Sequence, residues 1–423
     1  MTAAERFVRR DLPAGVRVLQ AGLVVNAFGN GAAAPFIIIY LHDVRGVPLP
    51  VAGLASASSA AAAVIATLVA GRVADRFGLR ATMGAGLALS TVAYGLYPFI
   101  RLPWHAVGLA VLAGSGIGAW LTMQSAMLAA LTPSALRHMA FAWQRVAANV
   151  GLGLGGFAGG LLVTTSRPAS FAVLFWANAA TFVIYMGFLM RIPLAGVTRT
   201  VAMKAGSYRA VASDRVFLRF VAVNFMVVAG AIALLNALVP VFVKNEAHVD
   251  ERIIGGLFLL NSAMVIGLQL PVTRLLEGRP RMRAFALMAV MFAISWGFVA
   301  AAPVAGRLGV AVVSLVMAIA VFSVAECIYD AVQGPLVADL APPELLVRYL
   351  AVTAFSWQLG FIVGPAVGAA VLANAPTAVW LLGAGVCVIA GVVSLRVDGL
   401  LPERARTTPA RRAASDAAAE PVA

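Results

Sequence analysis

The sequence predicts an all-α membrane protein with twelve transmembrane helices, arranged in two pseudo-symmetric six-helix bundles. Three observations predict this fold class. Apolar runs of span length recur along nearly the whole chain, basic residues concentrate in alternate loops, and one long polar stretch near the middle separates six runs from six. Hydrophobic residues make up 62% of the chain and charged residues 11%, whereas soluble domains carry about 25% charged residues. The composition therefore excludes an ordinary soluble domain.

The apolar runs are long enough to cross the hydrocarbon core of a bilayer, for which about 20 residues suffice. Because the backbone must satisfy its own hydrogen bonds in lipid, these runs are expected to be helices. The spans are predicted at residues 16–40, 51–73, 81–100, 105–131, 140–164, 170–190, 216–243, 252–276, 284–302, 308–340, 349–372 and 378–397. The chain then divides into an N-terminal bundle at 1–190, a cytoplasmic linker at 191–215, a C-terminal bundle at 216–397 and a disordered tail at 398–423.

The 31 basic residues, which contribute to a net charge of +14, are distributed unevenly among the loops. One alternating set of loops holds only six of them, namely Arg45, Arg101, Arg167, Lys244, Arg252 and Arg307. The other loops and both ends of the chain hold the rest, apart from Arg145. By the positive-inside rule the richer side is cytoplasmic, so both termini are expected in the cytoplasm. This distribution favours a lipid bilayer as the partner of the positive charge and argues against nucleic acid.

A charged hairpin, Gly71-Arg72-Val73-Ala74-Asp75-Arg76-Phe77-Gly78-Leu79-Arg80, joins the second and third runs. Charge is expensive near hydrocarbon, so such a hairpin is unusual. Its pattern, G-x-x-x-D-R-x-G-x-R, resembles the loop between helices 2 and 3 of the major facilitator superfamily of secondary transporters. The resemblance implies a conformational gate formed by Gly71, Asp75, Arg76, Gly78 and Arg80.

Each gate residue has an expected role. Gly71 would allow close helix packing, Gly78 would supply a turn with positive φ, and Asp75 would pair with an arginine or with a helix N-terminus. The second half has Leu275 at the position equivalent to Asp75, which predicts a latch in one half only.

Weak internal repeats support two related halves, the plan that the superfamily resemblance implies. Pro35 is matched by Pro240, and the hairpin that ends at Gly78 is matched by one that ends at Gly278. A third repeat pairs Phe141-Ala142-Trp143-Gln144 with Phe355-Ser356-Trp357-Gln358.

The glycine runs in the fifth and eleventh spans align the two halves with a different residue offset from that of the third repeat. Gly151-x-x-x-Gly155-Gly156-x-x-Gly159-Gly160 resembles a span-5 motif of proton-coupled drug antiporters of the superfamily, with Gly156 where the motif has proline. The eleventh span carries Gly360-x-x-x-Gly364-Pro365-x-x-Gly368-Ala369. Since small residues let helices approach closely, Gly151, Gly155, Gly159, Gly364 and Pro365 are expected to pack between the bundles. Ordinary tight helix packing is the alternative.

Two carboxylates, Glu326 and Asp330, fall well inside a predicted span. Four residues apart, they share one helical face, and in a low-dielectric setting such a pair can take up and release a proton near neutral pH. We expect them to be the proton-coupling site. The alternative is a structural acid, hydrogen-bonded to neighbouring helices or paired with Arg145.

Polar residues in the spans suggest a substrate cavity formed by Asn26, Gln124, Asn236 and Arg145. Each amide alone is more often a link between helices. Arg145 could instead extend its charged group to the cytoplasmic interface.

Together these features predict a secondary active transporter that works by alternating access, with proton-coupled efflux of small hydrophobic or cationic compounds, including drugs, as the preferred function. The alternatives are an importer of a sugar, organic acid or other metabolite, and a non-transporting membrane scaffold or sensor. No phosphate-binding loop, metal cluster or nucleophile arrangement is evident, so no cofactor and no enzymatic activity are expected. We expect a monomer in a bacterial inner (plasma) membrane. The bacterial source is suggested by the arginine bias, since only two of the basic residues are lysines.

Overall fold

The structure, a computed structural model, describes residues 13–132, 137–192, 208–342 and 345–407. The central part of the predicted linker and most of the predicted tail lie outside these ranges. Within them the chain is helical, and the one β-pairing is an isolated bridge between Pro280 and Thr407. The predicted all-α class is confirmed.

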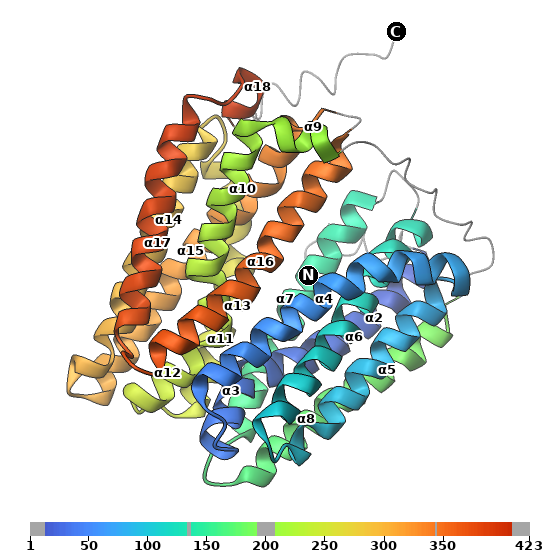
Figure 1. The fold of residues 1–423 in the computed structure, drawn as a ribbon, viewed down its shortest axis with the longest axis vertical. Helices are drawn as coiled ribbons and strands as arrows, with labels where there is room; N and C mark the ends of the chain where they lie inside the picture. Colours follow the sequence, from blue (N-terminus) through green and yellow to red (C-terminus); the bar gives the residue numbers. More distant parts are fainter. Residues whose placement is uncertain (1–12, 133–136, 193–207, 343–344, 408–423) are drawn as a thin grey trace. The chain divides into compact units, whose positions relative to one another are not determined.

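The helices of the first half begin at α2 and end at α8 (Figure 1). Their bounds are α2 Ala14–Ala33, η1 Ala34–Phe36, α3 Ile37–Ile39, η2 Tyr40–Val44, α4 Leu49–Phe77, α5 Leu79–Leu96, η3 Tyr97–Phe99, α6 Pro103–Leu131, α7 Arg137–Leu162 and α8 Pro168–Met190.

The helices of the second half follow a short helix, α9. Their bounds are α9 Tyr208–Ser213, α10 Arg215–Val227, η5 Val228–Ile232, α11 Ala233–Ala237, α12 Val239–Glu246, α13 Glu251–Leu275, α14 Arg281–Ala301, η6 Pro303–Ala305, α15 Leu308–Leu340, α16 Leu346–Leu372, α17 Ala378–Asp398 and α18 Glu403–Arg406.

Ten helical segments of the described residues are long and apolar enough to cross a membrane. The two remaining predicted spans, the third and the fifth, are occupied by α5, with 18 residues, and α7, with 26 residues. Helices therefore stand at all twelve predicted positions.

Contacts divide the chain into two units, one of residues 1–203 and 250–262 and the other of residues 204–249 and 263–423. The boundary after Met203 falls inside the predicted linker. The grouping of 250–262 with the first unit differs from the predicted bundles. It reflects packing of the first turns of α13 on α7, where the Thr165 backbone N–H donates to Glu251 Oε1 at 3.1 Å.

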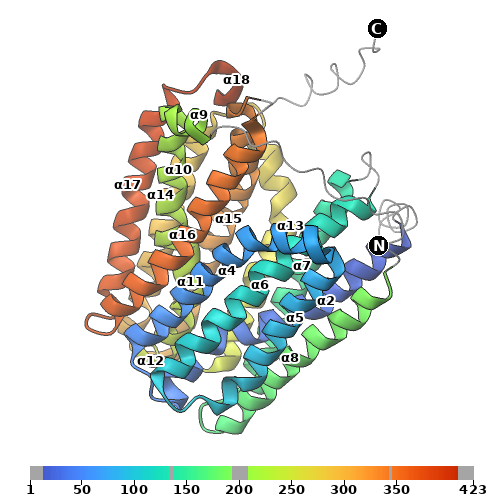
Figure 2. The same ribbon diagram turned by 45° about the vertical axis from the view of Figure 1, so that its right-hand side comes forward.

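The first unit is held by helices that lie side by side at very short separation. α4 packs along α6 and α2 along α7, as both ribbon views show (Figures 1 and 2). A Cβ atom built on Gly114 or Gly118 of α6 would collide with the backbone carbonyl of Ser59 or Ala63 of α4. These glycines bring the two backbones into contact, as small residues do in membrane helix pairs.

Gly78 ends α4 and begins the turn into α5 with φ +84°, and Gly278 has φ +72° at the equivalent place in the second half. The predicted positive-φ turn at Gly78 and the repeat between the hairpins are confirmed. By contrast, nothing lies within 4 Å of a Cβ built on Gly71, so the close packing expected there is not present.

Replacing Gly78 by alanine should destabilise the protein by about 1 kcal/mol, because a residue with a Cβ atom is strained at positive φ. Thermal unfolding of the purified protein would measure this loss. Gly71→Ala is the matched control from the same hairpin and should be neutral or slightly stabilising, since its Cβ would meet no atom within 4 Å and alanine favours a helix more than glycine does.

The prolines matched between the halves mark breaks in the corresponding helices. Pro35 lies in the 3₁₀ turn η1, and Pro240 lies in the first turn of α12, after α11 has ended at Ala237. The second half also contains a π-turn, η5, which has no counterpart at the same depth of α2. Trp296 Nε1 of α14 donates to Gly230 O within η5 at 2.7 Å.

The glycine runs of α7 and α16 are in the correct register, and the Phe-x-Trp-Gln repeat is accidental. Gly155 of α7 abuts Phe28 of α2, and Gly364 of α16 abuts Ala229 of the equivalent helix, with a built Cβ 2.7 Å from its carbonyl oxygen. Equivalent glycines thus contact equivalent helices.

The same contacts correct the role expected for these glycines. Gly151, Gly155 and Gly159 face α2, and Gly364 faces η5 and α11, so each packs against the first span of its own half. Pro365 lies within α16 beside Gly364. Other glycines of α7 pack elsewhere, since Gly156 and Gly160 face Phe258 and Gly255 of α13.

The first residues of the predicted disordered tail are ordered. α18 follows α17 closely, with Leu401 and Ala405 buried, and Arg406 Nε donates to Asp398 O at 3.2 Å. The residues from 408 onward lie outside the described ranges.

Candidate functional site

The candidate site is centred on the acidic segment, which we define as Glu326–Asp330 of α15. This helix has 33 residues, and the segment lies near its middle. Glu326 and Asp330 are both half-buried, whereas Cys327, Ile328 and Tyr329 between them are buried. The two carboxylates therefore share a face that is partly accessible, while the opposite side of the segment packs into the second unit.

A buried hydrogen-bond network fixes the packed side of the acidic segment. Tyr329 Oη donates to Asn224 Oδ1 of α10 at 2.9 Å, and Asn224 Nδ2 donates to Ser356 Oγ of α16 at 2.8 Å. Ser356 Oγ donates onward to Thr353 O at 2.8 Å. Because every member has a partner, the network can link α10, α15 and α16 without the cost of an unpaired polar group in the core.

A second link reaches the acidic segment from α13. Gln269 Nε2 donates to Cys327 O at 3.2 Å. Hydrogen bonds to α10 and α13, and onward through Asn224 to α16, therefore hold the packed side of the segment in place. A rigid pair of carboxylates in a membrane-crossing helix can bind a proton or a cation.

The predicted cavity residues differ in burial and in their neighbours. Asn26 is fully buried where α2 packs on α8: Gly22 and Gly29, on the same face of α2, abut Tyr185 and Thr181. This position makes Asn26 part of a helix interface, although its Nδ2 has no partner.

Gln124 of α6 is also fully buried, and both its amide atoms lack a partner. Asn236 is exposed, and its Nδ2 donates to Ile232 O, the last carbonyl of the π-turn, at 2.9 Å. Arg145 is exposed on α7.

The gate residues of the first half are mostly exposed. Asp75, Arg76 and Gly78 are exposed, and Asp75 forms no ion pair with any described residue. Arg76 lies over the ring of Phe77, 5.3 Å from its centroid. Arg80 is half-buried, and its guanidinium donates to the carbonyl of Ile192 just beyond the end of α8.

The second half carries a buried ion pair, although the latch was predicted for the first half only. Arg281 of α14 is 1% exposed, and its guanidinium lies 2.6 Å from Asp339 Oδ2 at the end of α15. Sequence comparison of the two hairpins missed this pair because Asp339 lies outside the repeated motif.

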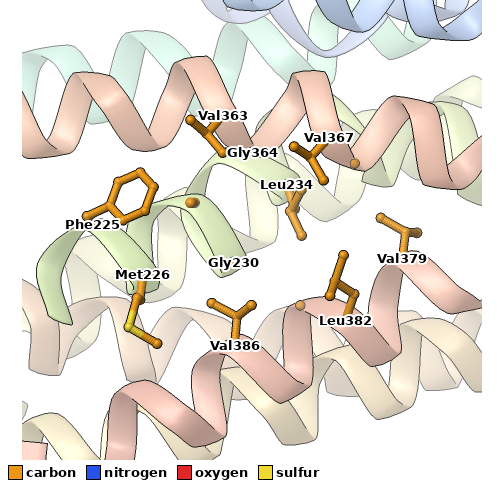
Figure 3. Close-up of a pocket in the computed structure, with 13 residues that line it drawn as sticks. Phe225, Met226, Gly230, Leu234, Val363, Gly364, Val367, Val379, Leu382 and Val386 are labelled. Carbon is orange, nitrogen blue, oxygen red and sulfur yellow. The ribbon is translucent and has the colours of Figure 1, made fainter. Parts of the chain in front are cut away.

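An apolar pocket of about 230 Å³ opens in the second unit beside the π-turn (Figure 3). Phe225 and Met226 of α10, Val363 and Val367 of α16, and Leu382 and Val386 of α17 surround it in the close-up. No titratable group lines this pocket, so its chemistry differs from that of the acidic segment. Apolar runs alone gave no signal for this pocket.

Comparison with known proteins establishes the family. The profile of the Major Facilitator Superfamily matches residues 21–325. The chain belongs to this superfamily, which makes it a multi-pass membrane transporter.

Curated relatives agree in length with the chain. It is 25% identical over 389 residues to the MFS-type transporter YdeE of Escherichia coli (strain K12), covering 89% of this chain and 94% of that protein. It is 24% identical over 388 residues to a Na⁺, Li⁺, K⁺/H⁺ antiporter of Planococcus maritimus, covering 82% and 88%.

Solved structures share the fold. A nucleoside transporter, NupG, superimposes with a TM-score of 0.75 at 14% identity, covering 90% of this chain and 99% of that one. A D-xylose-proton symporter gives a TM-score of 0.72 at 15% identity, covering 93% and 99%. At these identities the likeness establishes the fold alone.

Proposed function

We propose that this transporter exports small hydrophobic or cationic compounds in exchange for protons, across a bacterial plasma membrane and with both termini in the cytoplasm. The single observation that carries the proposal is the pair of half-buried carboxylates, Glu326 and Asp330, one turn apart on membrane-crossing α15. We further propose that a single copy of the chain performs the cycle.

The two acids would alternate between cargo and protons. When ionised, they attract a cation into a region where charge is otherwise expensive. When protonated, they lose that attraction, and the cation is released. The hydrogen-bonded side of the acidic segment, through Tyr329 and Asn224, would keep the carboxylates in place during the exchange.

Two kinds of cargo fit this chemistry. An organic cation with an apolar body suits two acids near the middle of a helix whose mean hydropathy is high. An inorganic monovalent cation is the second candidate, favoured by the antiporter of Planococcus maritimus among the relatives.

A reconstituted flux assay tests the proposal. Vesicles that contain the purified protein and a trapped pH dye, with an imposed pH gradient, should lose that gradient when ethidium is added, and should concentrate ethidium. Sodium chloride in place of ethidium tests the inorganic cation. If neither cation couples to proton flux, proton-coupled export of cations is overturned.

Neutralising the two acids tests whether they couple transport to the proton gradient. Glu326→Gln and Asp330→Asn should reduce gradient-driven accumulation to the level of protein-free vesicles, while the wild type accumulates cargo. Glu246→Gln, an exposed acid at the end of α12, is the matched control and should transport normally. Intact accumulation in both acidic-segment variants would rule out the assigned coupling site.

A further inference from the structure

A second pocket, in the first unit, has a different chemical character from the site above. It has a volume of about 490 Å³ and lies between α2 and α7, a size typical of small-molecule sites. We call it the α2–α7 pocket. It is lined by Arg17, Gln20, Ala21 and Val24 of α2 and by Trp143, Val146, Ala147 and Val150 of α7.

The lining follows one face of each helix. On both helices the four residues recur at i, i+3, i+4 and i+7, which places them on a single stripe. Polar groups gather at one end, with Arg17, Gln20 and Trp143, and apolar side chains at the other, with Val24 and Val150. The pocket is therefore amphipathic along its length.

Its polar end carries positive charge. Arg17 is exposed and lies in the first turn of α2, which begins at Ala14 without a side-chain cap. The uncapped N–H groups of a helix N-terminus add a partial positive charge to that of the guanidinium. Both favour an anionic group at this end.

The polar end also contains an unused acceptor. Gln20 Nε2 donates to Ala140 O of α7 at 3.2 Å, whereas Gln20 Oε1 is buried and has no partner. A buried acceptor without a donor is costly, so a ligand that places an O–H group here would gain affinity.

We infer that the α2–α7 pocket binds an amphipathic anion: a phosphate-type head with a hydroxyl donor at Arg17 and Gln20, and an alkyl chain along Val24 and Val150. An anionic phospholipid and a free alkyl phosphate share this chemistry. The inference is independent of the proposed cation export, because it concerns residues of the other unit.

Native mass spectrometry of the full-length protein in neutral detergent tests the site. Titration with phosphatidylglycerol should give one tightly retained lipid per protein, and phosphatidylcholine, which has no hydroxyl donor and no net charge, should bind more weakly. Arg17→Gln should weaken phosphatidylglycerol binding about five-fold, the effect of one basic residue at a membrane surface. Arg396→Gln, an exposed arginine in the last turn of α17, is the matched control and should bind as the wild type does.

A second variant fills the pocket without altering charge. Ala147→Phe should abolish the retained lipid and leave Arg17 in place. Decyl phosphate then identifies the source of the ligand: displacement of the lipid supports a site for free amphipathic anions, and persistence of the lipid supports a phospholipid site. The inference is overturned if Arg17→Gln and Ala147→Phe both bind phosphatidylglycerol like the wild type, or if phosphatidylcholine binds equally well.

Discussion

Replacing Gly114 by alanine is expected to destabilise the first unit by about 1–3 kcal/mol, the usual cost of overpacking. The added Cβ would collide with the carbonyl oxygen of Ser59 and lie 2.7 Å from its carbonyl carbon. Both atoms belong to the backbone of α4, so no side chain can rotate away. Either α4 and α6 separate, losing the contacts that the short distance allows, or α6 bends.

Gly108 of the same helix provides the matched control. Nothing lies within 4 Å of a Cβ built there, so Gly108→Ala should be neutral or stabilise the protein by up to about 1 kcal/mol through helix propensity. Thermal melts followed by size-exclusion chromatography in detergent would compare the two variants. Equal stability of both would show that α4 and α6 do not depend on backbone contact.

Replacing Asp339 and replacing Arg281, which form an ion pair, should have unequal effects on the stability of the protein. Arg281 is almost fully buried, while the Asp339 side chain is 40% exposed. Asp339→Ala leaves a buried guanidinium whose Nε lacks a partner and whose other contact is Ala405 O at 3.4 Å. Loss of one partner of a buried pair costs about 3–5 kcal/mol.

Arg281→Met should cost far less, about 1 kcal/mol or below, because the remaining carboxylate can be hydrated and a buried charge is removed. The double variant should be more stable than Asp339→Ala alone. A double-mutant cycle from melting curves measures this coupling. Additive effects of the two substitutions would contradict a strongly coupled pair.

The sequence predicted the helices well because their signal is local. The lengths of the apolar runs and the placement of charges predicted helices at all twelve positions. Gly78 predicted a turn whose positive φ only glycine adopts readily. Pro35 and Pro240 were recognised only as a repeat within continuous spans, and the helix breaks at both were not predicted, although proline removes a backbone donor.

Contacts between helices were harder to predict, because they depend on which neighbouring helix each helical face packs against. The glycines of α7 and α16 were correctly read as packing residues, but the neighbour that each one touches could not be obtained from spacing. Asn26 shows the same limit, since it lies in a helix interface within its own unit. The acids of the candidate site stood out by type alone, whereas Tyr329 and Ser356, ordinary residues in apolar runs, gave no comparable signal.

The π-turn η5 has a consequence for the ancestry of the two halves. A π-turn holds one residue more than the α-turn that it replaces, and one residue rotates a helix by about 100°. Past Ile232 the side chains of the seventh span are therefore rotated relative to those of an uninterrupted α-helix. Eleven residues separate Ala229 from Pro240, whereas seven separate Phe28 from Pro35, so the two spans have diverged in length between equivalent positions, and the extra residue of the π-turn is one part of that divergence.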